Sequence, residues 1–215
     1  MLDEIIVKNL TLEIPEHYLS LINKLESNEF KLYVTGGAIR NKLLGFDYMD
    51  IDLVCIGRSK EDFKENFKGE IRIIADFDNV LIYTVNRVDF FAISFSDSIE
   101  EDFYMRDFTV NSFIYNVKAS KLYGRAIAYE DIDNKVLRPC NRSNLSLITT
   151  LRGIRLSTNY KLIPIDDNVL NTLTGVNTKF LSIRLKNELS KHNNPLPREL
   201  EKITVDKIYY TDYFL

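Results

Sequence analysis

One stretch of the chain, residues 34–52 (VTGGAIRNKLLGFDYMDID), constrains the fold and the chemistry more than any other. An apolar run ends at Gly36-Gly37, and a short helical segment containing Arg40 follows. A glycine pair at a strand-to-helix turn lets backbone N–H groups come close to a phosphate. A guanidinium just beyond the turn suits the same ligand, the alternative being that Arg40 is an ordinary surface residue of the helix.

Two carboxylates close this stretch, because Asp50 and Asp52 flank one apolar residue at the start of the next apolar run. Alternate residues of a strand point to the same face, so the two carboxylates are predicted to lie together. Asp89 is a third candidate because it lies in the apolar run RVDFFAISF. A buried charge there needs a partner or a metal, and the alternative is an edge-strand aspartate. The pattern predicts a site for two divalent metals and a nucleoside triphosphate.

Two further pairs of residues are candidates for contacts with a nucleotide. Arg106 and Asp107 begin RDFTVN, which follows a polar run (SDSIEEDFYMR) that we expect to be a loop. Asp107 would otherwise be only a helix N-cap. Arg152 and Arg155 lie three residues apart in LRGIRL and therefore share one helix face. That face would reach a phosphate or a base, or would simply be solvated.

Composition limits the class of protein. The 215 residues, 45% hydrophobic and 27% charged, are typical of one folded domain with at most a small appendage. A net charge of −3 argues against an extended nucleic-acid footprint and leaves a small acceptor or a short RNA end. Cys55 and Cys140 form no CxxC pair, which favours reduced thiols in a cytoplasmic protein. With no signal-peptide pattern and no run of membrane-spanning length, no membrane partner is expected.

Periodicity divides the chain into two parts. Helices are predicted over 15–28, 37–44 and 60–68. The runs KLYV, DIDLVCI, EIRIIAD, NVLIYTV and RVDFFAISF are typical of strands. Helical periodicity dominates the later part of the chain. We therefore predict an α/β head domain over 1–140 and a helical segment over 141–215.

The motifs together resemble a known family. GGAIRNKLLGFDYMDIDLV is similar to the head-domain signature GGxxRDxxLGxxxxDxD of class II tRNA nucleotidyltransferases and bacterial poly(A) polymerases. RDFTVN resembles their RRDFTxN, DIDNKVLR their DLxxxxLR, and LRGIRL the second half of their EDxxRxxRxxRF. SIRLKNELSK is similar to their last neck motif, through Arg184, Glu188 and Lys191. The resemblance runs from about residue 30 to residue 191.

The resemblance implies a fold and a metal site. The fold would be a polymerase-β-like nucleotidyltransferase head, α/β (α+β) with a mixed five-stranded sheet, followed by a helical neck. Asp50 and Asp52 would bind Mg²⁺, with Mn²⁺ as the alternative, and Asp89 would lie near them as the third catalytic carboxylate.

The resemblance also implies the contacts of the nucleotide. The turn at Gly36 and Gly37, together with Arg40, would bind the triphosphate of ATP or CTP. Arg106 would contact the nucleotide and Asp107 its ribose. From the neck, Arg152 and Arg155 would add nucleotide contacts.

Several positions depart from the family's pattern: Asn41, Met105, Ile127, Ala128, Leu145, Ser146 and Thr149. Leu145, Ser146 and Thr149 occupy the positions of the family's EDxxR motif. In the family, the Asp and Arg of this motif select CTP or ATP. Base selection is therefore expected to differ. The chain also carries no counterpart of the family's tRNA-holding body and tail, so weak tRNA binding is expected, with a homodimer as one means of strengthening it.

These observations favour a metal-dependent nucleotidyltransferase that moves NMP from an NTP to a hydroxyl acceptor and releases pyrophosphate. An RNA 3′ end such as that of tRNA is the favoured acceptor. A protein side chain or small molecule, as in toxin-like relatives, is one alternative. A nucleotide-binding regulatory module without catalysis is another.

Overall fold

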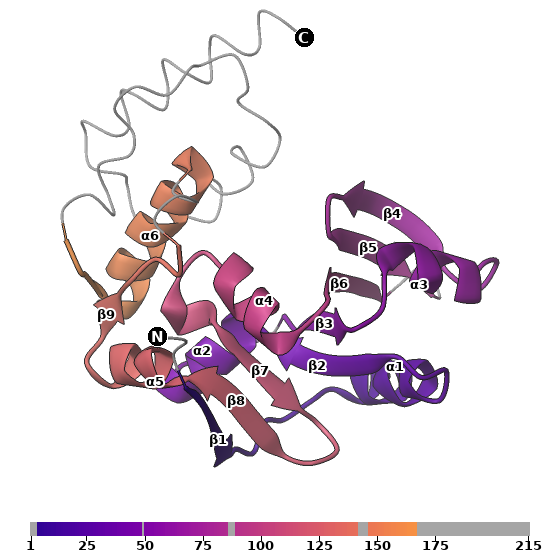
Figure 1. Ribbon diagram of the computed structural model, residues 1–215, viewed down its shortest axis with the longest axis horizontal. Coiled ribbons are helices and arrows are strands. Elements are labelled where there is room, and N and C mark those ends of the chain that lie inside the picture. Colours follow the sequence, from indigo (N-terminus) through magenta and orange to yellow (C-terminus); the bar gives the residue numbers. More distant parts are fainter. Residues whose placement is uncertain (1–3, 49, 86–88, 142–145, 167–215) are drawn as a thin grey trace, which may run out of the picture. The chain divides into compact units, whose positions relative to one another are not determined.

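The computed structural model describes residues 4–48, 50–85, 89–141 and 146–166. The chain forms two compact units, residues 1–134 and 135–215, which are described separately below (Figure 1). In the described residues no helix has the length and apolar character needed to cross a bilayer. The predicted boundary between head and neck stays a prediction.

The first unit is built on one mixed sheet with the strand order β1-β8-β7-β2-β3-β6-β5-β4. Strands β3 and β6 pair in parallel, and every other pair of neighbours is antiparallel. The strands are β1 (Ile5–Asn9), β2 (Lys31–Thr35), β3 (Asp52–Ile56), β4 (Arg72–Phe77), β5 (Val80–Thr84), β6 (Phe90–Ser96), β7 (Phe113–Asn116) and β8 (Lys121–Arg125).

The predicted α/β architecture with a mixed sheet is confirmed, and the sheet has eight strands rather than five. The hairpin β7–β8 extends the sheet beyond β2, and β1 is added at its edge by pairing with β8. Strand β1 has no fully buried residue. Because an edge strand of this kind lacks the alternating apolar pattern of a half-buried strand, its sequence gives little sign of it.

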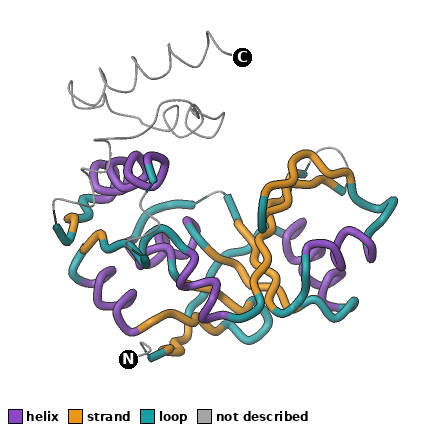
Figure 2. The backbone as a smooth tube through the Cα atoms, turned by 45° about the horizontal axis from the view of Figure 1, so that its top comes forward, coloured by secondary structure: helices purple, strands orange, loops and turns teal. Residues whose placement is uncertain are grey.

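Helices cover both faces of the central strands, as the tube view in Figure 2 shows by colour. Strand β3 is buried on both faces, since the successive residues Leu53, Val54 and Cys55 are all buried. On one face, Phe63 of α3 is at the centre of a cluster of aromatic rings. The helices of this unit are α1 (Glu16–Glu26), α2 (Gly37–Leu44), α3 (Lys60–Asn66), α4 (Ile99–Met105), the 3₁₀ helix η1 (Thr109–Asn111) and α5 (Ala126–Asp133).

The polar run SDSIEEDFYMR is helical, so its prediction as a loop was wrong. The side chain of Ser98 caps the N-terminus of α4 by accepting from the backbone N–H of Glu101 at 3.1 Å. Phe103 of this helix packs with Val54 and Ile114 in the core on the second face of the sheet. A helix this short and polar is stabilised mainly by tertiary packing, which local sequence does not report.

The described part of the second unit contains one helix and a small parallel pair of strands. Helix α6 (Leu147–Tyr160) begins after Ser146, and β9 (Val136–Leu137) pairs with β10 (Ile163–Pro164). The predicted helices beyond residue 166, the residues matched to the last neck motif, and Leu145 lie outside the described residues.

Candidate active site

The glycine pair forms the turn between β2 and α2, and the carboxylate of Asp52 lies against it. Gly36 adopts φ 73° and ψ −136°, a conformation that side-chain-bearing residues rarely take. Asp52 is the register partner of Thr35, the last residue of β2. A Cβ placed on Gly36 would be 3.1 Å from Oδ2 of Asp52. The absent side chain therefore leaves room for the carboxylate beside the start of a helix.

The charges of the three candidate carboxylates all act on one phenol, that of Tyr18 in α1. Burial raises the pKa of Tyr18, a hydrogen bond from the backbone of Ile51 opposes that shift, and the charges of Asp52, Asp50 and Asp89 raise it further. The interaction between two charges weakens with distance. Asp89 comes near because β6 runs parallel to β3, where Asp52 pairs with Ala92. The carboxylates thus share one region of the head.

Two of these carboxylates suit a hard divalent cation. The side chains of Asp50 and Asp52 are exposed, and oxygen ligands are those that Mg²⁺ and Mn²⁺ prefer. Within the described ranges no group of three or more His, Cys, Asp or Glu side chains is close enough to enclose a metal by itself. Mg²⁺ is commonly held by one or two carboxylates together with substrate phosphates and water. The residues present fit that arrangement.

Arg40 is buried, which contradicts the alternative that it is a surface residue of the helix. Only 7% of the residue is exposed. Its Nη1 donates to Oδ1 of Asn111 at 2.6 Å, and Nδ2 of Asn111 donates to Oδ1 of Asp107 at 2.9 Å. The guanidinium lies over the turn, 3.4 Å from the position that a Cβ on Gly37 would take. Its predicted contact with a triphosphate stays a prediction.

Asn41 has a structural role that explains its departure from the family's aspartate. Its Oδ1 accepts from Nη2 of Arg40 at 2.8 Å, and its Nδ2 donates to the backbone oxygen of Asp47 at 2.7 Å. A carboxylate has no proton to give to a carbonyl oxygen at neutral pH. The amide therefore links the buried arginine to the loop that leads to Asp50.

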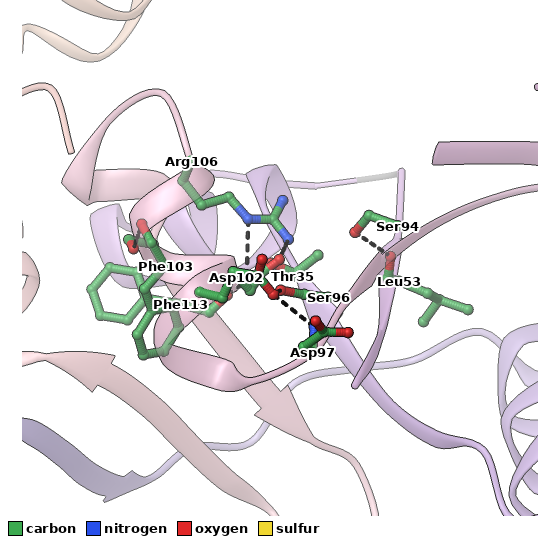
Figure 3. A network of polar contacts seen from close by, with 11 residues as sticks. Thr35, Leu53, Ser94, Ser96, Asp97, Asp102, Phe103, Arg106 and Phe113 are labelled. Atoms are coloured by element: carbon green, nitrogen blue, oxygen red, sulfur yellow. Dashed lines mark hydrogen bonds and ion pairs between the residues drawn. The ribbon is translucent and has the colours of Figure 1, made fainter. Parts of the chain in front are cut away.

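Arg106 and Asp107 both have local partners. Nε of Arg106 donates to Oδ2 of the buried Asp102 at 3.0 Å, and the two side chains form a bidentate ion pair (Figure 3). The carboxylate of Asp107 accepts from the backbone N–H of Phe108 at 2.7 Å, next to the start of η1. The N-cap residue of η1 is Phe108 and no side chain caps this helix, so Asp107 is not its N-cap. The predicted contacts of Arg106 and Asp107 with the nucleotide stay predictions.

In the second unit, the two positions that stand in place of the base-reading pair form a helix cap. Oγ of Ser146 accepts from the backbone N–H of Thr149 at 3.2 Å, and the two hydroxyl oxygens lie 3.0 Å apart. Arg152 and Arg155 lie on the same helix and are half-buried. Their predicted contacts with a nucleotide are not tested by this geometry.

Tyr18 is the residue near the carboxylates that sequence reasoning did not select. Its ring packs edge-on against that of Phe91 at 5.2 Å between centroids, and the residue is buried. In sequence it is one member of the apolar stripe of an amphipathic helix, so nothing distinguishes it from a core residue. The only available signal was its hydroxyl, because a buried phenol needs a polar partner.

Comparisons with known proteins agree with this geometry. A family model described as the poly A polymerase head domain matches residues 82–138. The CCA-adding enzyme of Streptococcus thermophilus (strain CNRZ 1066) is 29% identical over 159 residues, which are 65% of this chain and 39% of that enzyme. The CCA-adding enzyme of Streptococcus pneumoniae (strain CGSP14) is 26% identical over 178 residues, or 73% of this chain and 44% of that enzyme. The chain thus spans less than half the length of these curated relatives.

Solved structures share the fold. The Thermotoga maritima CCA-adding enzyme complexed with tRNA superposes with a TM-score of 0.69 at 23% identity, covering 93% of this chain and 55% of that one. The Bacillus stearothermophilus CCA-adding enzyme in complex with CTP gives a TM-score of 0.63 at 19% identity, covering 80% and 47%. Taken together, the sequence motifs, the family match and the curated relatives make the chain similar to the tRNA nucleotidyltransferase and poly(A) polymerase family, and the solved structures show that it shares their fold.

Proposed function

We propose that this protein is a metal-dependent nucleotidyltransferase that transfers NMP from ATP or CTP to the 3′ hydroxyl of an RNA such as tRNA and releases pyrophosphate. The observation that carries the proposal is the carboxylate of Asp52 lying against the Gly36 turn. A turn suited to phosphate and a carboxylate suited to metal therefore occupy the same place. The CCA-adding enzymes to which the chain is similar support RNA as the acceptor class.

Each part of the site has a task in this reaction. Divalent metal, held by Asp50 and Asp52, would neutralise charge on the phosphates and lower the pKa of the attacking hydroxyl. The backbone N–H groups at the start of α2 would bind and orient the triphosphate. Arg40, fixed by Asn111, would keep the turn in place and supply positive charge beside it. Asp89 adds negative charge that favours cations in this region.

Incubation with Mg²⁺, each of the four labelled NTPs in turn, and total RNA that includes tRNA lacking its 3′ end tests the proposal. We expect label on RNA with CTP or ATP, pyrophosphate released in equal amount, and loss of both on chelation of the metal. Label on protein or small molecules alone would instead favour the toxin-like or small-molecule class. NTP binding without pyrophosphate release would favour a regulatory module.

Tyr18→Phe is expected to slow transfer while leaving the fold intact. The ring that packs on Phe91 remains, but the hydroxyl that bonds the backbone of Ile51, between the two aspartates, is lost. One hydrogen bond is worth about 1 kcal/mol, so the rate should fall roughly fivefold. Single-turnover transfer and thermal unfolding measure the two effects. Tyr83→Phe is the matched control and should transfer at the normal rate, because the buried hydroxyl of Tyr83 has no hydrogen-bond partner among the described residues.

A further inference from the structure

Asp102 in α4 is a buried carboxylate to which the proposed reaction gives no task. Only 5% of the residue is exposed. An ionised group at this depth needs a partner, and the partner is Arg106, four residues further along the helix. Nε of Arg106 donates to Oδ2 of Asp102 at 3.0 Å and Nη2 donates to Oδ1 (Figure 3). Two parallel bonds fix both the place and the plane of the guanidinium.

The pair leaves one edge of the guanidinium open. A guanidinium has five N–H donors, and Asp102 accepts from two of them. The side chain of Arg106 makes no other hydrogen bond among the described residues. It is 20% exposed, whereas the side chain of Asp102 is 6% exposed. The carboxylate therefore lies on the inner side of the pair, and a ligand can reach the remaining donors of the arginine.

The backbone that carries Asp102 is anchored to the core. Phe103, the next residue, is fully buried and packs on the second face of the sheet. Its backbone oxygen accepts from Oγ of Ser112 at 2.9 Å, which ties the end of α4 to the segment after η1. Because interiors are close-packed, this part of the helix cannot shift without disturbing its neighbours. A support of this kind is what a precisely placed binding group requires.

The segment that carries Arg106 is also tied to the glycine turn. The next residue, Asp107, accepts from Nδ2 of Asn111 at 2.9 Å, and Oδ1 of Asn111 accepts from Arg40 at 2.6 Å. Arg40 in turn lies over Gly37. These contacts hold the backbone beside Arg106 in a fixed relation to the place where the triphosphate is proposed to bind.

Stability alone is a weak reason for a pair of this kind. The cost of taking two charges out of water offsets much of their attraction. Apolar side chains in place of a buried ion pair often leave a protein equally stable or more stable. A task that needs a guanidinium held in one orientation is a stronger reason.

We propose that Asp102 is a positioning residue that acts through Arg106 to orient the incoming NTP. The assignment rests on the proposed function. Asp102 does not touch the nucleotide; it holds the guanidinium so that the open edge can donate hydrogen bonds to it. A donor that is fixed in advance loses less entropy on binding. Because the pair has no net charge, it contributes directed hydrogen bonds, and the phosphate charge is left to the metal and to Arg40.

Binding of CTP and ATP with Mg²⁺ and without RNA, measured by calorimetry, tests this role. Asp102→Asn keeps the size of the side chain but replaces one acceptor oxygen by a donor, which frees the guanidinium to rotate. Binding should weaken roughly tenfold, as for the loss of a hydrogen bond to a charged group. Arg106→Gln should weaken it at least as much. The double variant should bind no worse than Arg106→Gln, because Asp102 acts only through Arg106.

Transfer kinetics separate positioning from a purely structural role. In Asp102→Asn the KM for the NTP should rise roughly tenfold, while the KM for RNA stays the same. A smaller fraction of folded protein would instead lower kcat and leave both KM values unchanged. Asp102→Glu keeps the ion pair but displaces the guanidinium by one methylene group. This variant should remain folded, as thermal unfolding can show, and should also raise the KM for the NTP.

Glu101→Gln is the matched control, because it makes the same change from carboxylate to amide in the same helix. Glu101 accepts from Oγ of Ser96 at 2.8 Å and from the backbone N–H of Asp97 at 2.7 Å, and is not bonded to Arg106. This variant should bind NTP as the unmodified protein does.

Three results would overturn the positioning role, even if RNA is labelled. They are unchanged NTP binding in Asp102→Asn, a further loss when that change is combined with Arg106→Gln, and no NTP binding by the unmodified protein. NTP binding that depends on Asp102 through Arg106, without transfer to any acceptor, upholds the role and rejects the proposed function.

Discussion

Nucleotidyl transfer is expected to stop in the Asp50→Ala/Asp52→Ala double variant, while the protein remains folded. Both side chains are exposed, so their removal leaves no cavity in the core. Without them the metal loses its protein ligands, and a metal of this kind contributes several kcal/mol to the transition state. The transfer rate should fall by at least about 10³-fold. Label transfer and pyrophosphate release measure the loss of activity, and thermal unfolding tests whether the protein remains folded.

A readout independent of turnover separates metal binding from catalysis. Binding of Mn²⁺ in the presence of a non-hydrolysable NTP, followed by electron paramagnetic resonance, should be lost in the double variant. Asp133→Ala removes an exposed carboxylate of α5 and is the matched control, with normal metal binding and transfer. Full transfer by the double variant would show that the metal assignment is wrong.

Gly36→Ala is expected to reduce both stability and transfer. The backbone conformation of Gly36, with φ 73°, would cost a residue with a side chain about 1–3 kcal/mol. The new Cβ would also lie 3.1 Å from Oδ2 of Asp52 and push the carboxylate away. A displacement near 1 Å at a reacting centre can reduce the rate about 10²-fold. Denaturant unfolding and the transfer assay measure the two losses.

Gly57→Ala provides the control for backbone strain alone. Gly57 has φ +77°, and a Cβ there would meet nothing within 4 Å. This variant should lose about 1–2 kcal/mol of stability and keep its transfer rate. If both variants lose stability equally and Gly36→Ala transfers normally, the close approach of the turn and the carboxylate has no part in the reaction.

The local features of the head domain could be predicted from the sequence. The strand-to-helix turn at Gly36-Gly37 is where the pattern predicts it, and β3 begins at Asp52, so Asp50 of the predicted run DIDLVCI lies just before the strand. These features depend on a few neighbouring residues, through backbone freedom and the two-residue period of a strand. The run LVC is apolar on both faces because β3 lies in the middle of the sheet.

Long-range packing accounts for what the sequence did not reveal. The polar run that became α4 is held by Phe103 against Val54, which belongs to a strand far away in the chain. Thr109 of RDFTVN likewise donates a hydrogen bond of 2.7 Å to Asp131 of DIDNKVLR, which joins η1 to α5. Local propensity is a weak guide wherever tertiary contacts of this kind decide the conformation.

The sequence by itself determined the resemblance to a known family, the α/β class and the glycine turn followed by two aspartates, because these depend on motifs of short range. Only the tertiary structure decided that the charges of the three carboxylates act on Tyr18 and that Arg40 is buried against Asn111, 71 residues further along the chain. Strand register and helix docking bring such residues together. Both follow from burying one shared core, which no single segment encodes alone.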